Sequence, residues 1–158
     1  MKKPFILILL AMLAMLFIAG CAQEVKEEAS VDIEALQKKL QNADLFTDTL
    51  ERITKESVLT TVLFLDADSI ETHLLYMGSG YTGEEYGLFK CSSADAALAL
   101  TEDLKTRVDT MKNIYADYAP DAIPRLNNAI IRRQGSFVAY VVADKQAEAL
   151  SIVEEYFK

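Results

Sequence analysis

The chain has 158 residues and is acidic: 16 lysines and arginines stand against 24 aspartates and glutamates, a formal charge of −8 at pH 7. This length is sufficient for one domain with a hydrophobic core. The excess of acid argues against a nucleic-acid partner, which usually requires a basic face, and against broad adhesion to an anionic membrane surface.

The N-terminus has the pattern of a bacterial lipoprotein signal peptide. Two lysines precede an uncharged apolar run, residues 4–20, which ends with Ala19-Gly20 directly before Cys21. Small residues before a cysteine are typical of a lipobox, in which a diacylglyceryl group is attached to the cysteine sulfur and the leader is cleaved. We therefore expect residues 1–20 to be a signal peptide and Cys21 to anchor the chain to the outer, extracytoplasmic face of the cell membrane. An uncleaved spanning anchor is the alternative, because the run is close to the lower length limit for a membrane-spanning helix.

Loss of the leader, which holds two lysines and no acid, would change the formal charge to −10. Residues 21–30 then read as the lipidated cysteine and a polar, acidic tether, and residues 31–158 as a single domain. Cys91 would be the only remaining thiol, so no internal disulfide is expected and stability must come from packing.

The first predicted helix begins near Ser30 or Asp32, where apolar residues start to recur every three or four positions. The stretch 45–65 is ambiguous. Within it, residues 56–65 suit either a buried strand or a short helix, and periodicity does not separate the two.

Two β-hairpins are predicted further along the chain, each from two apolar stretches joined by a glycine-containing loop. The first consists of Ile70–Met77, the loop Gly78–Gly83 and Glu85–Cys91. The second consists of Ala129–Arg133, the turn Gln134-Gly135 and Phe137–Val142.

A long helix is predicted between the hairpins and a shorter one after them. Ser92 and Asp95 form a capping box at the start of the long helix, and its apolar stripe ends just before Pro120. The ring of Tyr118 continues that stripe and is expected to pack beneath the second hairpin. Asp144 is expected to cap the last helix. The order strand–strand–helix, twice over, predicts an α+β fold with a four-stranded, mostly antiparallel sheet and helices on one face.

Several short motifs follow one another in a distinctive order. They are Glu85-Tyr86-Gly87-Leu88-Phe89-Lys90, Arg107 within the long helix, Tyr118-Ala119-Pro120, Leu126-Asn127-Asn128-Ala129 and Gly135-Ser136-Phe137-Val138. This succession resembles the bacterial lipoprotein family known as domain of unknown function 4358, over roughly residues 45–158. The resemblance implies a short helix near residues 55–65, and it marks Arg107, Tyr118 and Pro120 as motif positions of unknown role. Because the family has no established activity, the resemblance implies a fold and a location but no mechanism.

Motifs for catalysis are weak. Gly78–Gly83 matches G-x-G-x-x-G, but a strand follows it where a dinucleotide site requires a helix, so a hairpin loop is the better interpretation. The single histidine, His73, could serve a nucleophile at Ser79 or Cys91, although no spacing supports such a pair. Asp66-Ala67-Asp68 lacks the later ligands of a calcium loop. We expect no metal and no cofactor; enzymatic activity is left open, with a non-enzymatic role favoured.

One cluster of charge stands out. No acidic residue occurs between Asp121 and Asp144, whereas Arg125, Arg132 and Arg133 lie in that interval. Arginine is suited to bidentate contact with carboxylate or phosphate, so these residues are candidate contacts for an anionic partner such as a wall polymer, a lipid headgroup or an acidic protein. A solvated turn is the alternative.

The sequence thus favours a lipid-anchored, non-enzymatic binding or interaction module. A structural subunit of a membrane assembly and a small extracytoplasmic hydrolase are the alternatives.

Overall fold

The computed structural model describes residues 30–158. The predicted signal peptide, Cys21 and most of the predicted tether lie outside the described residues. The elements, in chain order, are α2 (Ile33–Asn42), β1 (Glu51–Ile53), α3 (Ser57–Thr61), the 3-10 turn η1 (Ala67–Ser69), β2 (Ile70–Met77), β3 (Glu85–Cys91), α4 (Ala94–Tyr118), the 3-10 turn η2 (Pro120–Ala122), α5 (Ile123–Asn127), β4 (Ile130–Gln134), β5 (Phe137–Val142) and α6 (Gln146–Glu154).

A five-stranded antiparallel sheet in the order β1-β2-β3-β5-β4 forms the middle layer. The two predicted hairpins are β2–β3 and β4–β5, and they meet along β3 and β5. The α+β class and the antiparallel sheet are therefore confirmed. The prediction of four strands is wrong, because Glu51–Ile53 pairs with Leu75–Met77 as a short edge strand.

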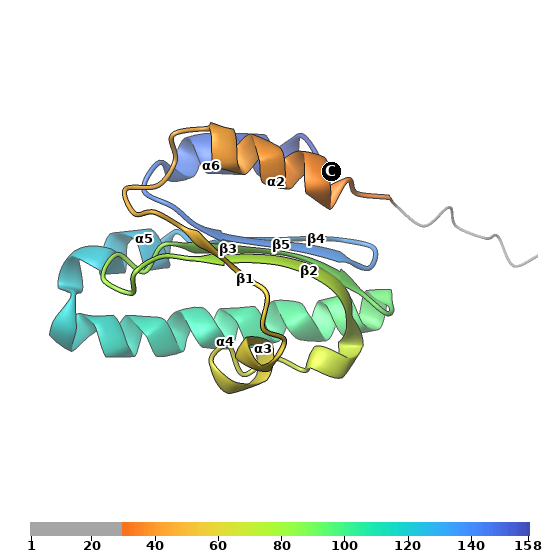
Figure 1. Cartoon of the computed structure of the whole chain (residues 1–158), viewed down its shortest axis with the longest axis horizontal. Coiled ribbons are helices and arrows are strands. Elements are labelled where there is room, and N and C mark those ends of the chain that lie inside the picture. The colour runs from red at the N-terminus through yellow and green to blue at the C-terminus, as the bar shows by residue number, and fades with distance from the viewer. Residues whose placement is uncertain (1–29) are drawn as a thin grey trace, which may run out of the picture.

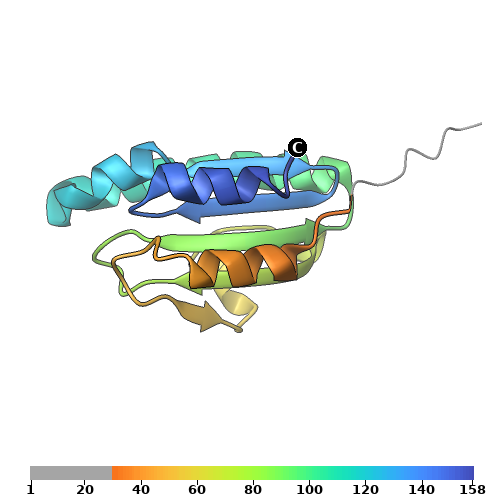
Figure 2. The ribbon, with the colours of Figure 1, turned by 90° about the horizontal axis from the view of Figure 1, so that it is seen from above.

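Helices cover both faces of the sheet, so the expectation of one covered face is also wrong (Figure 1). α2 and α6 lie side by side on one face, while α3, α4 and α5 lie on the other (Figures 1 and 2). The physical reason is visible in the central strands: every residue of Phe137–Val142 is buried. A continuous apolar run is typical of a strand covered on both faces, whereas alternation is typical of a half-exposed strand.

Two hydrophobic cores result, one on each side of the sheet. Successive side chains of a strand point to opposite faces, so the neighbours Leu88 and Phe89 enter different cores. On the α4 side the core includes Leu59, Leu75, Phe89, Leu104, Leu126 and Val138. On the α2 and α6 side it includes Leu36, Leu40, Tyr86, Leu88, Val141 and Val153.

The helix boundaries test the capping predictions. α4 begins one residue later than expected, because Ser93 rather than Ser92 accepts the hydrogen bond from the amide of Ala96 at 3.0 Å. It ends at Tyr118, before Pro120, as predicted. Asp144 does not cap α6: the N-cap position is occupied by Lys145, whose side chain makes no capping bond.

The ambiguous stretch contains a helix of five residues, Ser57–Thr61, as the family resemblance implied. None of the helices within residues 30–158 is long and apolar enough to cross a membrane.

Candidate functional site

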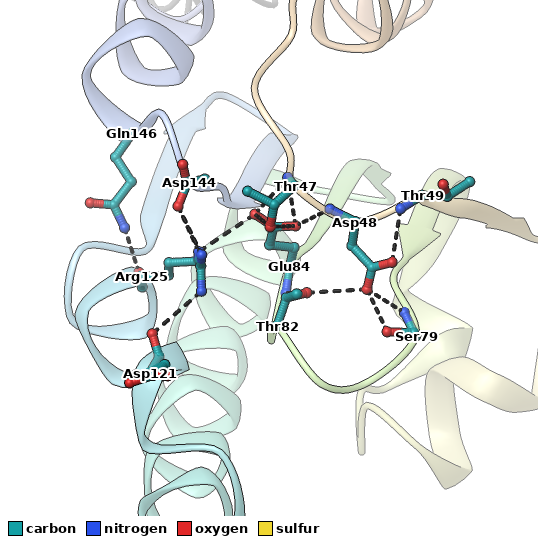
Figure 3. A network of polar contacts seen from close by, with 10 residues as sticks. All are labelled: Thr47, Asp48, Thr49, Ser79, Thr82, Glu84, Asp121, Arg125, Asp144 and Gln146. Atoms are coloured by element: carbon teal, nitrogen blue, oxygen red, sulfur yellow. Dashed lines mark hydrogen bonds and ion pairs between the residues drawn. The ribbon is translucent and has the colours of Figure 1, made fainter.

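Arg125, on α5, is the centre of a polar network at one end of the sheet (Figure 3). Its Nε and Nη2 donate to Oδ1 of Asp144 at 3.0 and 2.8 Å, and its Nη1 donates to the carbonyl oxygen of Asp121 at 3.3 Å. Its Nε also lies 3.5 Å from Oε1 of Glu84. An external anion would have to compete with these acceptors for the Arg125 guanidinium.

Glu84 connects this network to the loop between α2 and β1. Its side chain is fully buried, and it accepts hydrogen bonds from the amides of Thr47 and Asp48 at 3.0 and 2.7 Å. The hydroxyl of Thr47 donates to it as well, at 3.1 Å. Hydrogen bonds to a carboxylate are stronger than neutral ones, so Glu84 fastens the loop firmly to the start of β3.

Asp48 in turn holds the glycine-rich loop. Its Oδ2 accepts from the amide and the hydroxyl of Ser79 at 2.7 and 2.6 Å, and from the hydroxyl of Thr82 at 3.2 Å. The Ser79 hydroxyl is the main cause that lowers the pKa of Asp48 below its ordinary value. A Cβ atom at Gly78 would lie 2.6 Å from the same carboxylate, which explains the glycine there. The loop joins two strands and binds the chain's own acid, so its interpretation as a hairpin loop is confirmed.

The other two arginines of the cluster lie on β4 and have separate partners. Arg132 donates to Glu154 of α6 at 3.2 Å. Arg133 is exposed and donates to the carbonyl oxygen of Gly135 at 3.3 Å; it forms no ion pair with any residue in the described range. The structure therefore does not gather Arg125, Arg132 and Arg133 into one site. Their contact with an anionic partner stays a prediction.

Arg107, a motif position on α4, forms a buried ion pair with the first residue of β3. Its Nε and Nη2 each donate to Glu85 at 2.7 Å, and Glu85 also accepts from the hydroxyl of Tyr140 at 2.7 Å. The third bond of Arg107 runs to the carbonyl oxygen of Val62 at 3.1 Å. Burial acts to lower the pKa of Arg107, but the hydrogen bond and charge of Glu85 raise it overall. Burial raises the pKa of Tyr140 well above its ordinary value, so this phenol remains a donor. Arg107 thus joins α4, the sheet and the segment after α3.

Tyr118 does not pack beneath the second hairpin, which corrects the sequence-based expectation. Its ring is 52% exposed and lies against the glycine-rich loop of the first hairpin, where its hydroxyl donates to the carbonyl oxygen of Gly80. Tyr115 donates to the same oxygen at 2.7 Å, and the Tyr115 and Tyr118 ring centroids are 5.2 Å apart. Pro120 disfavours helical geometry at the preceding residue, so α4 ends at Tyr118. Tyr118 therefore lies at the C-terminal end of α4, beside this loop.

The exposure of Tyr118 predicts a modest loss of stability for Tyr118→Ala. We expect the free energy of unfolding to fall by about 1 kcal/mol, since about half of the ring area and one hydrogen bond are lost. Tyr118→Phe is the matched control: it keeps the ring, and Tyr115 still bonds Gly80, so its effect should stay below about 0.5 kcal/mol. Urea unfolding of both variants measures this, and a loss above about 3 kcal/mol for Tyr118→Ala would contradict the half-exposed position.

The candidate nucleophiles do not form a catalytic pair. Burial raises the pKa of the Cys91 thiol to about 11, which disfavours the reactive thiolate. The Ser79 hydroxyl donates to Asp48, and burial lowers the pKa of His73. No hydrogen bond joins His73 to Ser79 or Cys91 in the part of the chain that the structure describes.

Two of the hollows on the surface have aromatic side chains in their lining. The larger, of about 460 Å³, is an open polar cleft between the loop after α2 and the sheet, with Tyr76 and Tyr86 on its wall. Tyr86 stacks between Tyr76 and Phe46, at centroid distances of 4.7 and 5.7 Å. The hydroxyl of Tyr86 is buried without a hydrogen-bond partner in good geometry, because the nearby amide of Gln37 donates to Tyr76 instead.

The smaller hollow, of about 320 Å³, is apolar and lies between α4 and the segment after α3; we call it the α4 groove. Its lining residues are Val62, Leu63, Phe64, Asp103, Thr106, Arg107, Thr110, Met111 and Ile114. Leu63 and Met111 are buried, whereas Val62, Phe64 and Ile114 are exposed large apolar residues.

Phe64 adopts an unusual backbone conformation beside this groove. Its φ is 58°, in the left-handed region, where no other non-glycine residue of the described chain is found. A side chain in that region costs about 1–2 kcal/mol, and bulky residues are rarely found there. The turn allows Leu63 and Leu65 to enter the core while the Phe64 ring remains 77% exposed. No pattern in the sequence signalled this residue as special.

No group of three or more His, Cys, Asp or Glu side chains within residues 30–158 could hold a metal ion. The chain was compared with curated proteins and with solved structures, and neither comparison gave a match. A protein family does match, over residues 46–143, which is more than half of the chain and spans β1 to β5. The residues that form both hairpins, the Arg107–Glu85 pair and the Tyr118 contact all lie in this range. The chain therefore belongs to the family described as domain of unknown function (DUF4358).

Proposed function

We propose that the protein is a lipid-anchored, non-enzymatic binding module on the extracytoplasmic face of the cell membrane. The observation that carries this proposal is the apolar run with Ala19-Gly20 directly before Cys21, followed by a polar stretch and then by α2 from Ile33. Two acyl chains at Cys21 would give stable attachment. A tether from Cys21 to Ser30 would reach about 30 Å, which keeps the domain close to the bilayer.

Binding is favoured over catalysis because the polar side chains with chemistry to offer are engaged within the fold. Glu84, Glu85 and Asp48 each accept several hydrogen bonds, and Cys91 is buried. The proposed partner is a protein or an anionic wall component. Arg133 supports an anionic wall component as the partner. Its guanidinium is exposed and donates to a carbonyl oxygen rather than to a carboxylate.

A second candidate is a structural subunit of a membrane assembly. The exposed apolar residues Val62, Phe64 and Ile114 beside the α4 groove favour it, since clustered exposed apolar residues often mark protein contacts.

Cys21→Ser tests the anchor. We expect this variant to lose two properties of the wild type, the incorporation of a labelled fatty acid and the cleavage of the leader before residue 21, because serine cannot form the thioether. Cys91→Ala is the matched control, since it changes the other cysteine and should keep both properties. The proposal fails if Cys21→Ser is processed at the same bond and incorporates the fatty acid like the wild type.

A further inference from the structure

We propose that the outer edge of β4 binds an extended segment of a partner protein, which adds a further strand to the sheet and places an acidic side chain beside Arg133. The inference deepens the proposed binding role, on which it rests, but it does not depend on the lipid anchor. In strand addition of this kind, main-chain hydrogen bonds give affinity, and hollows for alternate side chains give specificity.

The first argument is the position of β4 in the sheet. It is the last strand of the order β1-β2-β3-β5-β4, so β5 pairs with one of its edges and no strand of residues 30–158 pairs with the other (Figure 2). The strand has five residues, Ile130–Gln134. An open edge presents a row of backbone amide and carbonyl groups to another chain.

The second argument is the direction of these backbone groups. Gln134 pairs with Phe137, and two residues lie between them. In such a hairpin the pair next to the turn exchanges both hydrogen bonds, and the backbone groups of successive residues alternate between the two sides of the strand. Gln134 and Arg132 therefore direct their backbone groups to β5, whereas Arg133 and Ile131 direct theirs outward.

The hydrogen bonds of the neighbouring strand agree with this assignment. The carbonyl oxygen of Ser136 accepts from the amide of Cys91 at 2.8 Å, on the β3 side, so the next residue of β5 faces β4. The outward amides of Ile131 and Arg133 donate to no side chain and to no loop carbonyl in the described part of the chain. Two amide donors on this edge are thus available to an added strand.

The third argument is a pair of hollows, one on each side of β4. The hollow on the α4 side has about 270 Å³, and its lining includes Val108, Leu126 and Ile131. The hollow on the α6 side has about 360 Å³, and its lining includes Ile130 and Leu150. Successive side chains of an added strand point to opposite faces and would reach the two hollows in turn. The edge and its hollows therefore match the alternation of an extended chain.

The fourth argument is charge, which sets the chemistry of the segment. The basic residues of the two linings each have an acidic partner; the pairs are Lys105 with Glu102 at 2.7 Å, Lys112 with Asp109 at 3.2 Å and Arg132 with Glu154 at 3.2 Å. Arg133 is on the same face as Ile131, the α4 side, and it pairs with no acid within residues 30–158. One positive charge thus remains on this edge of an acidic chain. An acidic side chain two positions from an apolar one would meet Arg133 and the α4-side hollow together.

A second copy of β4 is a poorer occupant of the edge. Ile130–Gln134 contains two arginines and no acid, so it cannot supply the carboxylate that Arg133 lacks. In an antiparallel pair of copies centred on Arg132, the two Arg132 side chains would lie directly opposite each other, and like charges in that position are destabilising.

Peptide selection identifies the segment and tests the contact. A phage library of random linear peptides is selected on the detergent-solubilised full-length chain, and enriched peptides are synthesised with a fluorescent label. We expect sequences without proline that have an acidic residue two positions from an apolar one. Fluorescence anisotropy then gives their dissociation constants. A selection without any enriched sequence would overturn the proposal.

Arg133→Pro removes the outward amide of this residue. Proline is tolerated on an edge strand when its nitrogen faces solvent, so the melting temperature should change by less than about 3 °C, while the dissociation constant of the peptides should rise at least tenfold. Arg133→Ala is the matched control, because it removes the charge but keeps the amide, and it should weaken binding by less than about fivefold. An equal loss in the two variants would overturn the proposal, since the charge alone would then hold the ligand, as expected for an anionic wall polymer.

N-methylation of the peptides is a second measurement, which does not depend on the folding of a variant. Each methyl group removes one amide donor of the peptide. Methylation at every second residue should weaken binding at least tenfold, and methylation at the residues between should change it by less than about twofold, because only alternate amides of a strand face its neighbour. A uniform effect along the peptide would exclude strand addition and overturn the proposal.

Two further comparisons separate this contact from other possibilities. A peptide with the sequence of residues 129–135 that binds more tightly than the selected peptides would assign the edge to a second copy and would also overturn the proposal. Cys21→Ser should leave all peptide affinities unchanged. Failure of the peptide contact and failure of the lipid anchor are therefore distinguishable.

Discussion

Arg107→Ala is expected to lower the free energy of unfolding by about 3–5 kcal/mol. The substitution leaves Glu85 buried, with Tyr140 as its remaining hydrogen-bond donor, so the carboxylate loses its two bonds to the guanidinium. A buried carboxylate without its counterion is strongly destabilising. The carbonyl oxygen of Val62 also loses its donor, so the segment after α3 should loosen with it.

Urea unfolding measures the loss, and two further variants define its cause. Arg133→Ala removes an exposed arginine of the same charge and should change stability by less than about 0.5 kcal/mol. The double change Arg107→Met, Glu85→Met removes both charges together and should recover most of the loss, because well-packed apolar residues often replace a buried ion pair without penalty. A loss below about 1 kcal/mol for Arg107→Ala would mean that water reaches Glu85.

Glu84→Ala is expected to cost about 3 kcal/mol. Two amides and one hydroxyl in the Thr47-Asp48 segment lose a buried charged acceptor, and Arg125 loses one of its carboxylates. Because these bonds hold the loop between α2 and β1, hydrogen exchange at the amides of Thr47 and Asp48 should accelerate at least tenfold.

Glu154→Ala is the matched control for this change. It removes a half-exposed glutamate that also pairs with an arginine, Arg132, and should cost less than about 1 kcal/mol. Slow exchange at Thr47 and Asp48 in Glu84→Ala would indicate that the loop is held by its apolar contacts instead.

The hairpins and the long helix could be predicted because their signals are local. Alternation, a glycine turn and a stripe at helical spacing each depend on neighbouring residues, and β2–β3, β4–β5 and α4 all appear where these signals lie. The strand β1 could not be predicted in this way. It has three residues and none of them is buried, so it shows no alternation of apolar and polar side chains. The second helical layer was predictable in principle: the uninterrupted apolar run Phe137–Val142 is typical of a strand covered on both faces.

Less of the candidate site could be predicted from the sequence, because charged residues that are far apart in the sequence form ion pairs in the folded chain. The interval between Asp121 and Asp144 contains arginines alone, yet the fold brings Glu84 and Asp144 to Arg125 and Glu154 to Arg132. The adjacent acids Glu84 and Glu85 also have different partners in the fold, the amide of Asp48 for Glu84 and the guanidinium of Arg107 for Glu85. Which basic group meets each acid depends on tertiary packing, which local patterns do not encode.

The position of α6 beside α2 has a consequence for the order in which the chain folds. Lys39 pairs with Glu155 and Lys145 pairs with Asp44, contacts that span 116 and 101 positions of sequence. The central strand pair β3–β5 is also non-local, so neither core can close until the last quarter of the chain is available. Folding of such a topology is slow relative to that of helical proteins of the same size. If the chain is exported as proposed, slow folding leaves time for it to cross the membrane while it is still unfolded. Docking of the C-terminal helix α6 is then the step that completes the domain.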